Sequence, residues 1–482
     1  MKRVIALVFV VGLFLGSVPA AQAAYPDPGA GKTDIFLQNI GADADGSVVL
    51  TYTTEAGAAG PGSATYAVSS AIPQWTTRMI PSDVATSPSL ASPWAGAVEV
   101  ASAEPMAALA AMTWDGTAKT AGVYKSEASP AKIVYVPLLV VADTSTFQAK
   151  SVLAIQNTEE TEATVDVYMR NAAGTTVKTI RGQVIPPKGE RRYDLSLSSY
   201  RPNFGPSGLG SAGVSSDKNV AVVVTLHWGS ADSYSSDAYQ APWRPATYLH
   251  FPGVFRWSPK YSELYVQNLS PKLTAYFEVY FRRWDGALSL LIKDQVLAPK
   301  GIKVYRTADL AALGTSWRGG VVVAPKAGTT PAALAGVCKY YQTAGVRDYA
   351  LYNAIPVQES AMNAASLVFP LVVRKRDLGA GNMYSTVFVR NLTGTTGPVT
   401  VEIYGPSGSI GSWTVNVSAM GQVELNLASG INLPSDALSK MGTNFTGSMR
   451  VVPGSGLQIL GAAHLFWDGV GRAGGYTAFR VE

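Results

Sequence analysis

A four-residue motif recurs four times along the 482-residue chain, and its spacing constrains the fold more than any single residue does. Each copy is an apolar stretch that ends in asparagine, and the four copies are Phe36-Leu37-Gln38-Asn39, Ala154-Ile155-Gln156-Asn157, Tyr265-Val266-Gln267-Asn268 and Phe388-Val389-Arg390-Asn391. The asparagines lie 118, 111 and 123 residues apart, which is the size of a small domain. A period of this length indicates one structural unit repeated in tandem.

A second recurrent segment follows each asparagine and ends in tyrosine. Its four copies end at Tyr52, Tyr168, Tyr280 and Tyr404. Each copy has apolar residues at its first and third places and mostly polar residues between them, which predicts a strand with one buried face. In the third repeat Asp285-Gly286 follows, a strong hairpin signal. We therefore expect the asparagines (Asn39, Asn157, Asn268 and Asn391) to be structural, each ending a strand and bonding its own backbone to start a turn.

The rest of each repeat also has the pattern of short strands. A glycine opens a later strand, at Gly96, Gly213, Gly319 and Gly447. A strand that ends in aromatic residues follows, at Trp114, Trp228, Tyr341 and Trp467. About seven short strands in roughly 115 residues, separated by Gly, Pro and Asp, predict an antiparallel β-sandwich. The predicted fold is all-β. Four tandem Ig-like β-sandwiches, at residues 24–128, 129–245, 246–358 and 359–482, follow a signal peptide.

The N-terminal segment has the pattern of a secretory signal peptide. Lys2 and Arg3 precede an apolar run of 12 residues, and Ala21-Gln22-Ala23 supplies small residues for cleavage. A membrane anchor is the alternative, but the run is short for a membrane-spanning helix, which needs about 20 apolar residues. We predict that residues 1–23 are removed and that the mature protein is secreted, to a periplasm, a cell surface or the extracellular space, and does not span a membrane.

Candidate catalytic and cofactor-binding residues are scarce. The chain has three histidines, and His227 and His464 are predicted at corresponding places beside the aromatic strand ends, where they are structural variants. No zinc-ligand spacing and no Gly-x-Ser-x-Gly nucleophile motif occurs. The single cysteine, Cys338, lies in an apolar strand and is predicted to be buried. We expect no catalytic residue and no cofactor, with an enzyme site between domains as an alternative.

Two loop patterns are candidate ligand sites. Asp43 and Asp45 are alternate carboxylates before a glycine, as at the start of a calcium loop, although the later ligands of an EF-hand are missing. A tight turn without metal is the alternative. Trp-Asp-Gly recurs at Trp114, Trp284 and Trp467. Exposed tryptophans there could stack on sugar rings, and the alternative is a strand-ending aromatic residue before a hairpin turn.

Charge is distributed unevenly among the repeats. Residues 25–128 contain four basic and ten acidic residues, a net charge of −6, whereas residues 246–358 contain 13 basic and six acidic residues, a net charge of +7. A basic domain without a nucleic-acid-binding motif in an exported protein does not indicate nucleic acid as a partner. Opposite net charges predict head-to-tail association, in which the acidic first domain of one molecule meets the basic third domain of another.

The order of these elements resembles a known type of protein. A strand ending in Gln-Asn, a short turn, a strand such as Val165-Asp166-Val167-Tyr168 and a glycine turn are similar to the tandem Ig-like repeats of large secreted bacterial surface proteins. More distantly, the hairpin at residues 157–167 is similar to the sandwich of sensory rhodopsin transducer proteins. Both resemblances imply binding or scaffolding and neither brings catalytic residues.

These observations predict a secreted, non-catalytic structural or adhesive protein of a cell surface, filament or extracellular matrix. Its partners would be further copies of itself or other surface proteins, joined through their sandwiches. The alternative is an array of polysaccharide-binding modules that uses loops and exposed aromatic residues.

Overall fold

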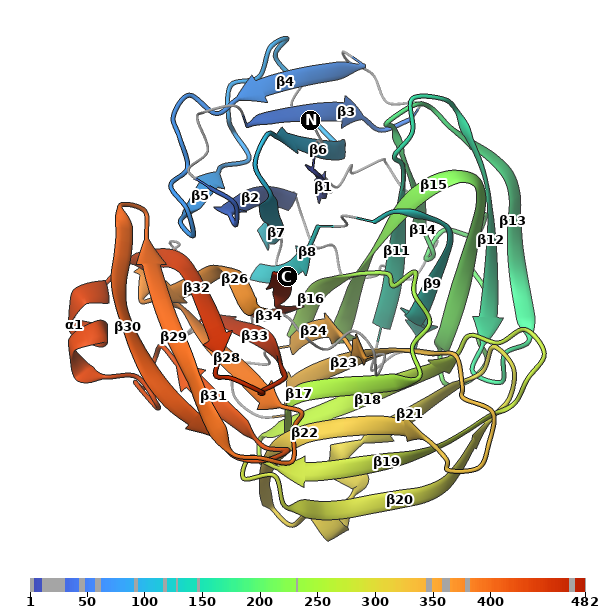
Figure 1. The fold of residues 1–482 in the computed structure, drawn as a ribbon. Helices are drawn as coiled ribbons and strands as arrows, with labels where there is room; N and C mark the ends of the chain where they lie inside the picture. Colours follow the sequence, from blue (N-terminus) through green and yellow to red (C-terminus); the bar gives the residue numbers. More distant parts are fainter. Residues whose placement is uncertain are drawn as a thin grey trace. The chain divides into compact units, whose positions relative to one another are not determined.

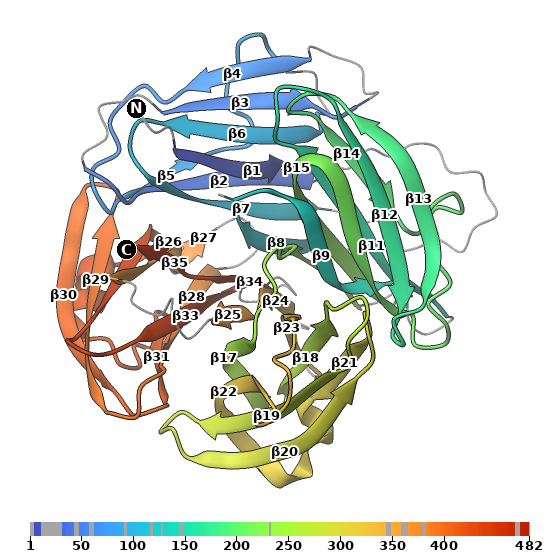
Figure 2. The same ribbon diagram turned by 45° about the vertical axis from the view of Figure 1, so that its right-hand side comes forward.

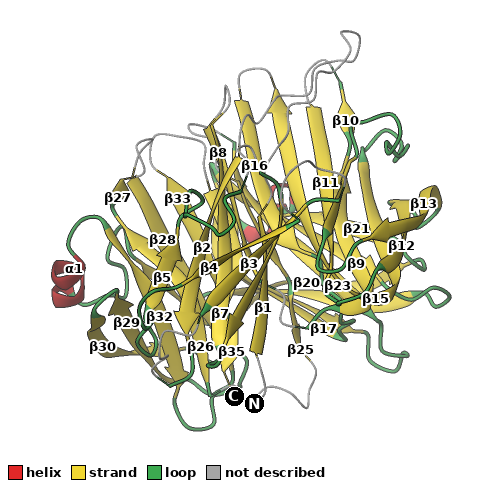
Figure 3. Ribbon diagram, turned by 90° about the horizontal axis from the view of Figure 1, so that it is seen from above, coloured by secondary structure: helices red, strands yellow, loops and turns green. Residues whose placement is uncertain are grey.

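The structure is a computed structural model that describes residues 4–10, 31–42, 48–56, 62–90, 94–115, 119–126, 129–144, 148–230, 233–343, 349–357, 365–377, 382–467 and 473–481. Strands dominate these residues, and α1 (Ser435–Met441) is the only α-helix among them (Figure 3). The chain forms two compact units, Met1–Gln74 with Arg78–Trp243, and Trp75–Thr77 with Arg244–Glu482. The first unit contains the first two repeats and the second unit contains the last two.

The first repeat is a sandwich of two antiparallel sheets. Their strand orders in the described residues are β1-β6-β3-β4 and β5-β2-β7-β8. The strands are β1 (Val4–Val10), β2 (Gly31–Asn39), β3 (Val49–Thr54), β4 (Ser63–Ala67), β5 (Thr77–Ile80), β6 (Gly96–Ser102), β7 (Met106–Asp115) and β8 (Lys119–Lys125).

In the second repeat one long strand belongs to both sheets. The first half of β15 pairs with β9 and β12, and its second half pairs with β11 and β16. The strands are β9 (Ala131–Val140), β10 (Ala142–Asp143), β11 (Gln148–Asn157), β12 (Ala163–Asn171), β13 (Thr176–Ile185), β14 (Glu190–Asp194), β15 (Leu209–Ser230) and β16 (Ser233–Gln240).

The third repeat has the same pairing, with its two sheets joined where β17 pairs with β18 at a hairpin. Its elements are β17 (Tyr248–Trp257), β18 (Lys260–Asn268), β19 (Ala275–Arg283), β20 (Leu288–Leu297), β21 (Ile302–Arg306), the 3-10 turns η1 (Thr307–Asp309) and η2 (Ala311–Leu313), β22 (Ser316–Pro325), β23 (Leu334–Gln342), β24 (Tyr349–Asn353) and β25 (Ile355–Val357).

The fourth repeat again separates into two sheets, with orders β30-β29-β32-β26-β35 and β27-β28-β33-β34 in the described residues, and β31 pairs with β28. Its strands are β26 (Ser366–Arg374), β27 (Arg376–Asp377), β28 (Asn382–Asn391), β29 (Gly397–Gly405), β30 (Gly408–Val417), β31 (Gln422–Asn426), β32 (Phe445–Pro453), β33 (Ile459–Trp467), β34 (Ala473–Thr477) and β35 (Phe479–Val481). The predicted all-β sandwich fold is confirmed.

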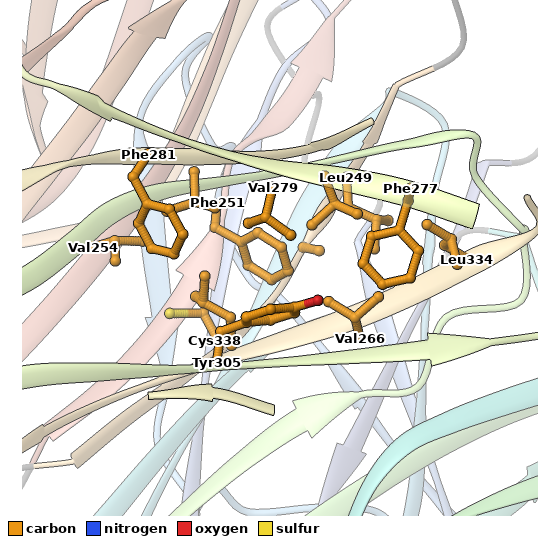
Figure 4. Close-up of a cluster of buried hydrophobic side chains, with 14 of the residues drawn as sticks. Leu249, Phe251, Val254, Val266, Phe277, Val279, Phe281, Tyr305, Leu334 and Cys338 are labelled. Atoms are coloured by element: carbon orange, nitrogen blue, oxygen red, sulfur yellow. The ribbon is translucent and has the colours of Figure 1, made fainter. Parts of the chain in front are cut away.

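Each sandwich buries the apolar residues of its alternating strands, and the third repeat shows this clearly (Figure 4). On β19 the side chains of Phe277, Val279 and Phe281 are buried, while the residues between them are exposed or half-buried. Each buried side chain of this size stabilises the fold by about 1.5–3 kcal/mol. Cys338 lies in the same core, as predicted, and burial raises the pKa of its thiol to about 12.

The recurrent glycines have a steric cause. A Cβ atom on Gly96, Gly319 or Gly447 would collide with a backbone carbonyl of the neighbouring strand. In the second repeat the equivalent residue is Gly210, where a Cβ would lie 2.6 Å from the carbonyl oxygen of Arg170. The prediction of Gly213 as the equivalent glycine is therefore wrong, because β15 begins four residues earlier.

The first repeat departs from the others on its tyrosine-ended strand. In β3 the buried side chains are Leu50 and Tyr52, whereas Val49 and Thr51 are half-buried. The predicted inward residues at the first and third places are thus wrong for this copy. A one-residue shift exchanges the two faces of a strand, and it places Tyr52 in the core.

Candidate functional site

The four recurrent asparagines are fully buried and connect distant parts of each repeat. In the second repeat Asn157 Oδ1 accepts from the Glu159 N–H at 3.0 Å, which starts the turn. Asn157 Nδ2 donates to the Thr161 carbonyl at 2.7 Å, and also to the carbonyls of Ile185 at 3.2 Å and Pro186 at 3.0 Å. The amide therefore ties the end of β11 to the end of β13, a long-range bond that local turn chemistry does not predict.

The same arrangement recurs in the other repeats. Asn39 bonds Gly41, Ala42 and Ile72, and the remaining two asparagines make the equivalent contacts. Asn268 and Asn391 also stand in Asn-x-Ser/Thr triplets, but their amide nitrogens are buried and donate to backbone carbonyls. In the folded chain these two asparagines are therefore not available for glycosylation.

Three of the recurrent tyrosines lie on the outer face of their sheet and bond a carboxylate two residues earlier. Tyr168 donates to Asp166 at 2.9 Å, and Tyr404 donates to Glu402 at the same distance. Tyr280 donates to Glu278 at 2.5 Å, and this bond raises the pKa of Tyr280. Tyr52 instead packs edge-on against Trp94, with ring centroids 5.6 Å apart.

The three Trp-Asp-Gly tryptophans have different surroundings. The side chains of Trp114 and Trp467 are 0% and 2% exposed, which excludes sugar stacking at these two places and agrees with the alternative of strand-ending aromatic residues. Both lie within a strand, β7 or β33, and point into a core or packed face. Trp284 lies in the hairpin turn after β19 and is 53% exposed. Of the three, Trp284 alone presents its ring to solvent in the described residues.

At the predicted metal site, the described residues show no arrangement of ligands. The calcium candidates Asp43 and Asp45 lie outside the described residues. Among the described residues, no group of three or more His, Cys, Asp or Glu side chains could hold a metal ion. In the same residues no helix is both long and apolar enough to cross a membrane.

All three histidines are buried and neutral. Burial lowers the pKa of each to about 3, helped by Lys150 for His227, Arg390 for His250 and Lys260 for His464. The prediction that His227 and His464 occupy equivalent positions is wrong, because their positions along the strand differ by two residues. His227 lies seven residues beyond the strand partner of Asn157, and His464 lies five beyond that of Asn391.

In the first compact unit the first two sandwiches lie side by side, with β8 against β16 (Figure 1). The Val123 N–H donates to Asp237 Oδ1 at 3.1 Å across this contact. A Cβ on Gly122 would lie 2.9 Å from a backbone nitrogen of β16, so the two backbones meet without an intervening side chain. A residue with a side chain at position 122 would keep the two strands further apart.

Buried charges join the same two sandwiches. The Ala56 N–H donates to the Glu190 carbonyl at 2.9 Å, and Arg192 Nε donates to Glu55 Oε2 at 3.0 Å. The Glu190 carboxylate is fully buried, and its Oε1 lies 3.7 Å from Arg192 Nε. Burial raises the pKa of Glu190 well above its usual value, the charge of Arg192 opposes this shift, and that of Glu55 adds to it. The guanidinium of Arg192 therefore lies beside two carboxylates, those of Glu55 and Glu190, and balances the charge of both.

A second ion pair crosses this interface, between Lys188 and Glu99 at 3.2 Å. Glu55 and Glu99 are acidic residues of the first repeat, and both are paired with bases of the second. Part of the negative charge of the first domain is thus compensated within its own compact unit.

In the second compact unit the third and fourth sandwiches meet through the same elements. The Gln422 N–H donates to the Trp284 carbonyl at 2.8 Å, so the same two places are bonded as Glu190 and Ala56 in the first unit, with donor and acceptor exchanged. Gln422 and Glu190 are each the first residue of their strand, after Gly421 and Gly189. The strands β24 and β34 take the places of β8 and β16 (Figure 2).

A cluster of aromatic side chains fills this interface. The interface of the first unit has an aromatic contact too, between Trp114 and His227 with ring centroids 5.3 Å apart, beside its polar contacts. The ring of His464 lies 5.0 Å from Phe388, 5.3 Å from Tyr352 and 5.5 Å from Tyr340, measured between centroids. Phe255 packs edge-on against Phe388 at 5.7 Å. Apolar area buried in this way stabilises the contact between the two sandwiches.

The arginine of the fourth motif copy also lies at this interface. Arg390 is 1% exposed and packs over Gly320, where a Cβ would collide with its guanidinium. This contact explains why Gly320 follows Gly319. Burial and the charge of Arg282 lower the pKa of Arg390 to about 9.

Each unit has an ion pair between its two sandwiches, and the signs of the two partners are reversed between the units. In the first unit Glu55 of the odd-numbered repeat pairs with Arg192 of the even-numbered repeat. In the second unit Arg318 of the odd-numbered repeat pairs with Glu424 of the even-numbered repeat at 3.0 Å. Arg192 and Glu424 hold the same place, two residues after the start of β14 and β31. Sequence reasoning missed these four residues, because nothing in a single strand shows which face will meet another sandwich.

No protein-family model matches the chain, and a search of curated proteins finds no match. Two solved structures have low-scoring similarity to it. One is a viral chemokine-binding protein, R17 of rodent gammaherpesvirus Peru, with 9% identity, a TM-score of 0.15 and coverage of 75% of this chain and 88% of that chain. The other is a tetra-tandem repeat in the extending region of a large adhesion protein, with 11% identity, a TM-score of 0.10 and coverage of 95% and 97%. Similarity at these scores carries no argument about function.

Proposed function

We propose that the protein is a secreted, non-catalytic structural or adhesive protein that acts by association of its sandwiches with further copies or other surface proteins. The observation that carries the proposal is the recurrent docking arrangement of the two compact units. In both units a hairpin of one sandwich bonds the first residue of β14 or β31 in the next. One sandwich of this chain thus packs on the next in the same way in both units, and the proposal extends this association to other molecules.

The histidines support a non-catalytic role. A general base must reach its substrate and exchange protons near the working pH. All three histidines are buried, and their pKa values near 3 keep them neutral at physiological pH. The proposal includes no cofactor, and the calcium candidates Asp43 and Asp45 stay predictions.

Assembly of the mature protein tests the proposal. We expect purified residues 24–482 to form concentration-dependent oligomers or filaments in light scattering and electron microscopy. A protein that stays monomeric up to about 100 μM and binds no surface protein of its source would contradict the proposal. Retention of residues 1–23 after export would contradict the predicted secretion route.

Salt dependence tests the head-to-tail version of this association. Lys272 and Lys293 are exposed bases of the third repeat. We expect K272E/K293E to weaken self-association at low salt, whereas K440E, on the fourth repeat, has little effect. Association that persists unchanged at about 1 M salt would contradict an electrostatic contact, because screening reduces the Debye length to about 3 Å.

Polysaccharide binding is a second candidate function, favoured by one observation. Trp284 presents a half-exposed ring on the basic third repeat, beside Arg283. An indole ring and adjacent donors are the usual means of holding an acidic sugar. Binding to a glycan array that is lost in W284A would establish this function, and an array without binding would reject it.

A further inference from the structure

The strand β1 occupies a position that every repeat fills. It pairs antiparallel with β6 from Val4↔Ser102 to Val10↔Gly96. The equivalent pairs are β9 with β15, β17 with β22, and β26 with β32. Figure 2 shows β1 beside β6 in the sheet β1-β6-β3-β4. Each sandwich therefore has a first strand at this position.

In the first repeat that strand coincides with the apolar part of the predicted signal peptide. Cleavage after Ala23 would remove Val4–Val10 and leave the seven residues 24–30 before β2. β1 pairs with β6 over seven residues, and β2 lies in the other sheet, so residues 24–30 must also supply the turn into Gly31 and leave too few residues to replace β1.

We infer that the mature protein presents β6 as an open edge that accepts a β-strand from another exported polypeptide. This inference rests on the proposed secretion with cleavage of the leader. An open edge binds a strand through main-chain hydrogen bonds, and pockets for alternate side chains select its sequence. Removal of β1 would free the ladder groups of Gly96–Ser102 on that side.

The structure defines the chemistry of the donor strand. On β6 the side chains of Val98 and Val100 are buried, while Glu99 between them and Ala101 after Val100 are half-buried. The donor must therefore have apolar residues opposite Val98 and Val100, over about seven residues antiparallel to β6. A shift by one residue would place the wrong face on the core.

A second copy of this chain does not supply such a strand among its described residues. The equivalent strands β9, β17 and β26 are already paired within their own sandwiches. The donor is thus a different polypeptide with a free apolar segment, or a free terminus, of matching pattern.

A binding experiment on the mature chain tests this inference. The probe is a labelled peptide with the sequence of Val4–Val10 between solubilising lysines, and fluorescence anisotropy measures its binding to residues 24–482. We expect saturable binding by the mature chain and at least tenfold weaker binding by the uncleaved chain, whose edge is occupied. A peptide with Leu7→Pro is the matched control, since proline removes a ladder donor.

Disulfide trapping tests the register. The protein variant A101C faces position 5 of the strand in the ladder Ile5↔Ala101, and the native Cys338 is buried and does not compete. We expect a peptide with Ile5→Cys to crosslink at least tenfold faster than one with Ala6→Cys, because directly opposite residues are within disulfide reach. Circular dichroism of A101C verifies that the variant is folded.

The outcomes separate the two proposals. An exported protein that begins at Met1 overturns both the secretion route and the open edge. A protein that begins near Ala24 but is monomeric and binds no peptide overturns the open edge alone, as does equal crosslinking by both peptides. Spontaneous oligomers that exclude the peptide also overturn a donor from another polypeptide.

Discussion

We predict that the first compact unit is highly sensitive to a change at Arg192. Its guanidinium bonds Glu55 and faces the fully buried Glu190, and the side chains of Arg192 and Glu55 are 12% and 18% exposed. The variant R192L removes the base and leaves two carboxylates without compensation. Removal of one partner of a buried pair costs about 3–5 kcal/mol, and we expect a loss in this range.

The reversed pair in the second unit is the matched control. Arg318 is 36% exposed, so R318L loses an ion pair that solvent already screens, at a cost of about 1 kcal/mol or less. Hydrogen exchange of the full chain, measured by mass spectrometry, reports on both interfaces through the exchange rates of the backbone amides in β8, β16, β24 and β34. At tenfold per 1.4 kcal/mol, R192L should accelerate exchange in β8 and β16 by about 100- to 3,000-fold.

A rescue variant separates charge from packing. With E55Q and E190Q added to R192L, the carboxylates become neutral amides, and at least half of the lost protection should return. Acceleration below about tenfold in R192L, or an equal effect of R318L, would show that these charges do not hold the sandwiches together.

Three further outcomes follow from the same reasoning. N157A should destabilise the second repeat by about 2–4 kcal/mol in urea unfolding, because it removes several buried hydrogen bonds, whereas N171A, which loses one exposed bond, should cost below about 1 kcal/mol. Because the pKa of His464 is lowered in the folded chain, the unfolded state binds a proton at this residue first as the pH falls. The free energy of unfolding should therefore decrease below about pH 6.5, by about 2 kcal/mol at pH 5 for this residue. A pH titration of the stability of H464Q should lack that part of the slope. The raised pKa of Glu190 has the opposite effect on stability, which declines as the pH rises above about 4.5. The variant E190Q should therefore be more stable than the native chain at pH 8 and equally stable below pH 4.

The fold could be predicted from the sequence because its signals are local. Alternation of buried and exposed residues follows from the two-residue period of a strand, and it holds on β19 residue by residue. The glycine at the start of β6, β22 and β32 is required by a neighbouring carbonyl within the same sheet. The repeat asparagine marks the same turn four times, which is why one motif was sufficient to predict the architecture.

The errors concern positions where a one-residue shift or a neighbouring element decides the outcome. Tyr52 matches the other tyrosines in sequence, but a shift of β3 turns it inward. Trp114 and Trp284 share the Trp-Asp-Gly motif, yet one lies within a strand and the other in a turn. A motif of three residues does not contain the register that separates these two environments.

The sequence by itself determined the repeat, the class of fold and the residues that start its turns, since these depend on neighbours along the chain or within one sheet. Only the tertiary structure decided how the sandwiches are joined within each unit. It buried Glu190 beside the half-buried Arg192 in one interface, and His464 and Arg390 in the other. It also revealed β1 as the first strand of the first sandwich. Such contacts join residues 70 or more positions apart, and their free energy depends on burial and distance, which no periodicity along the chain encodes.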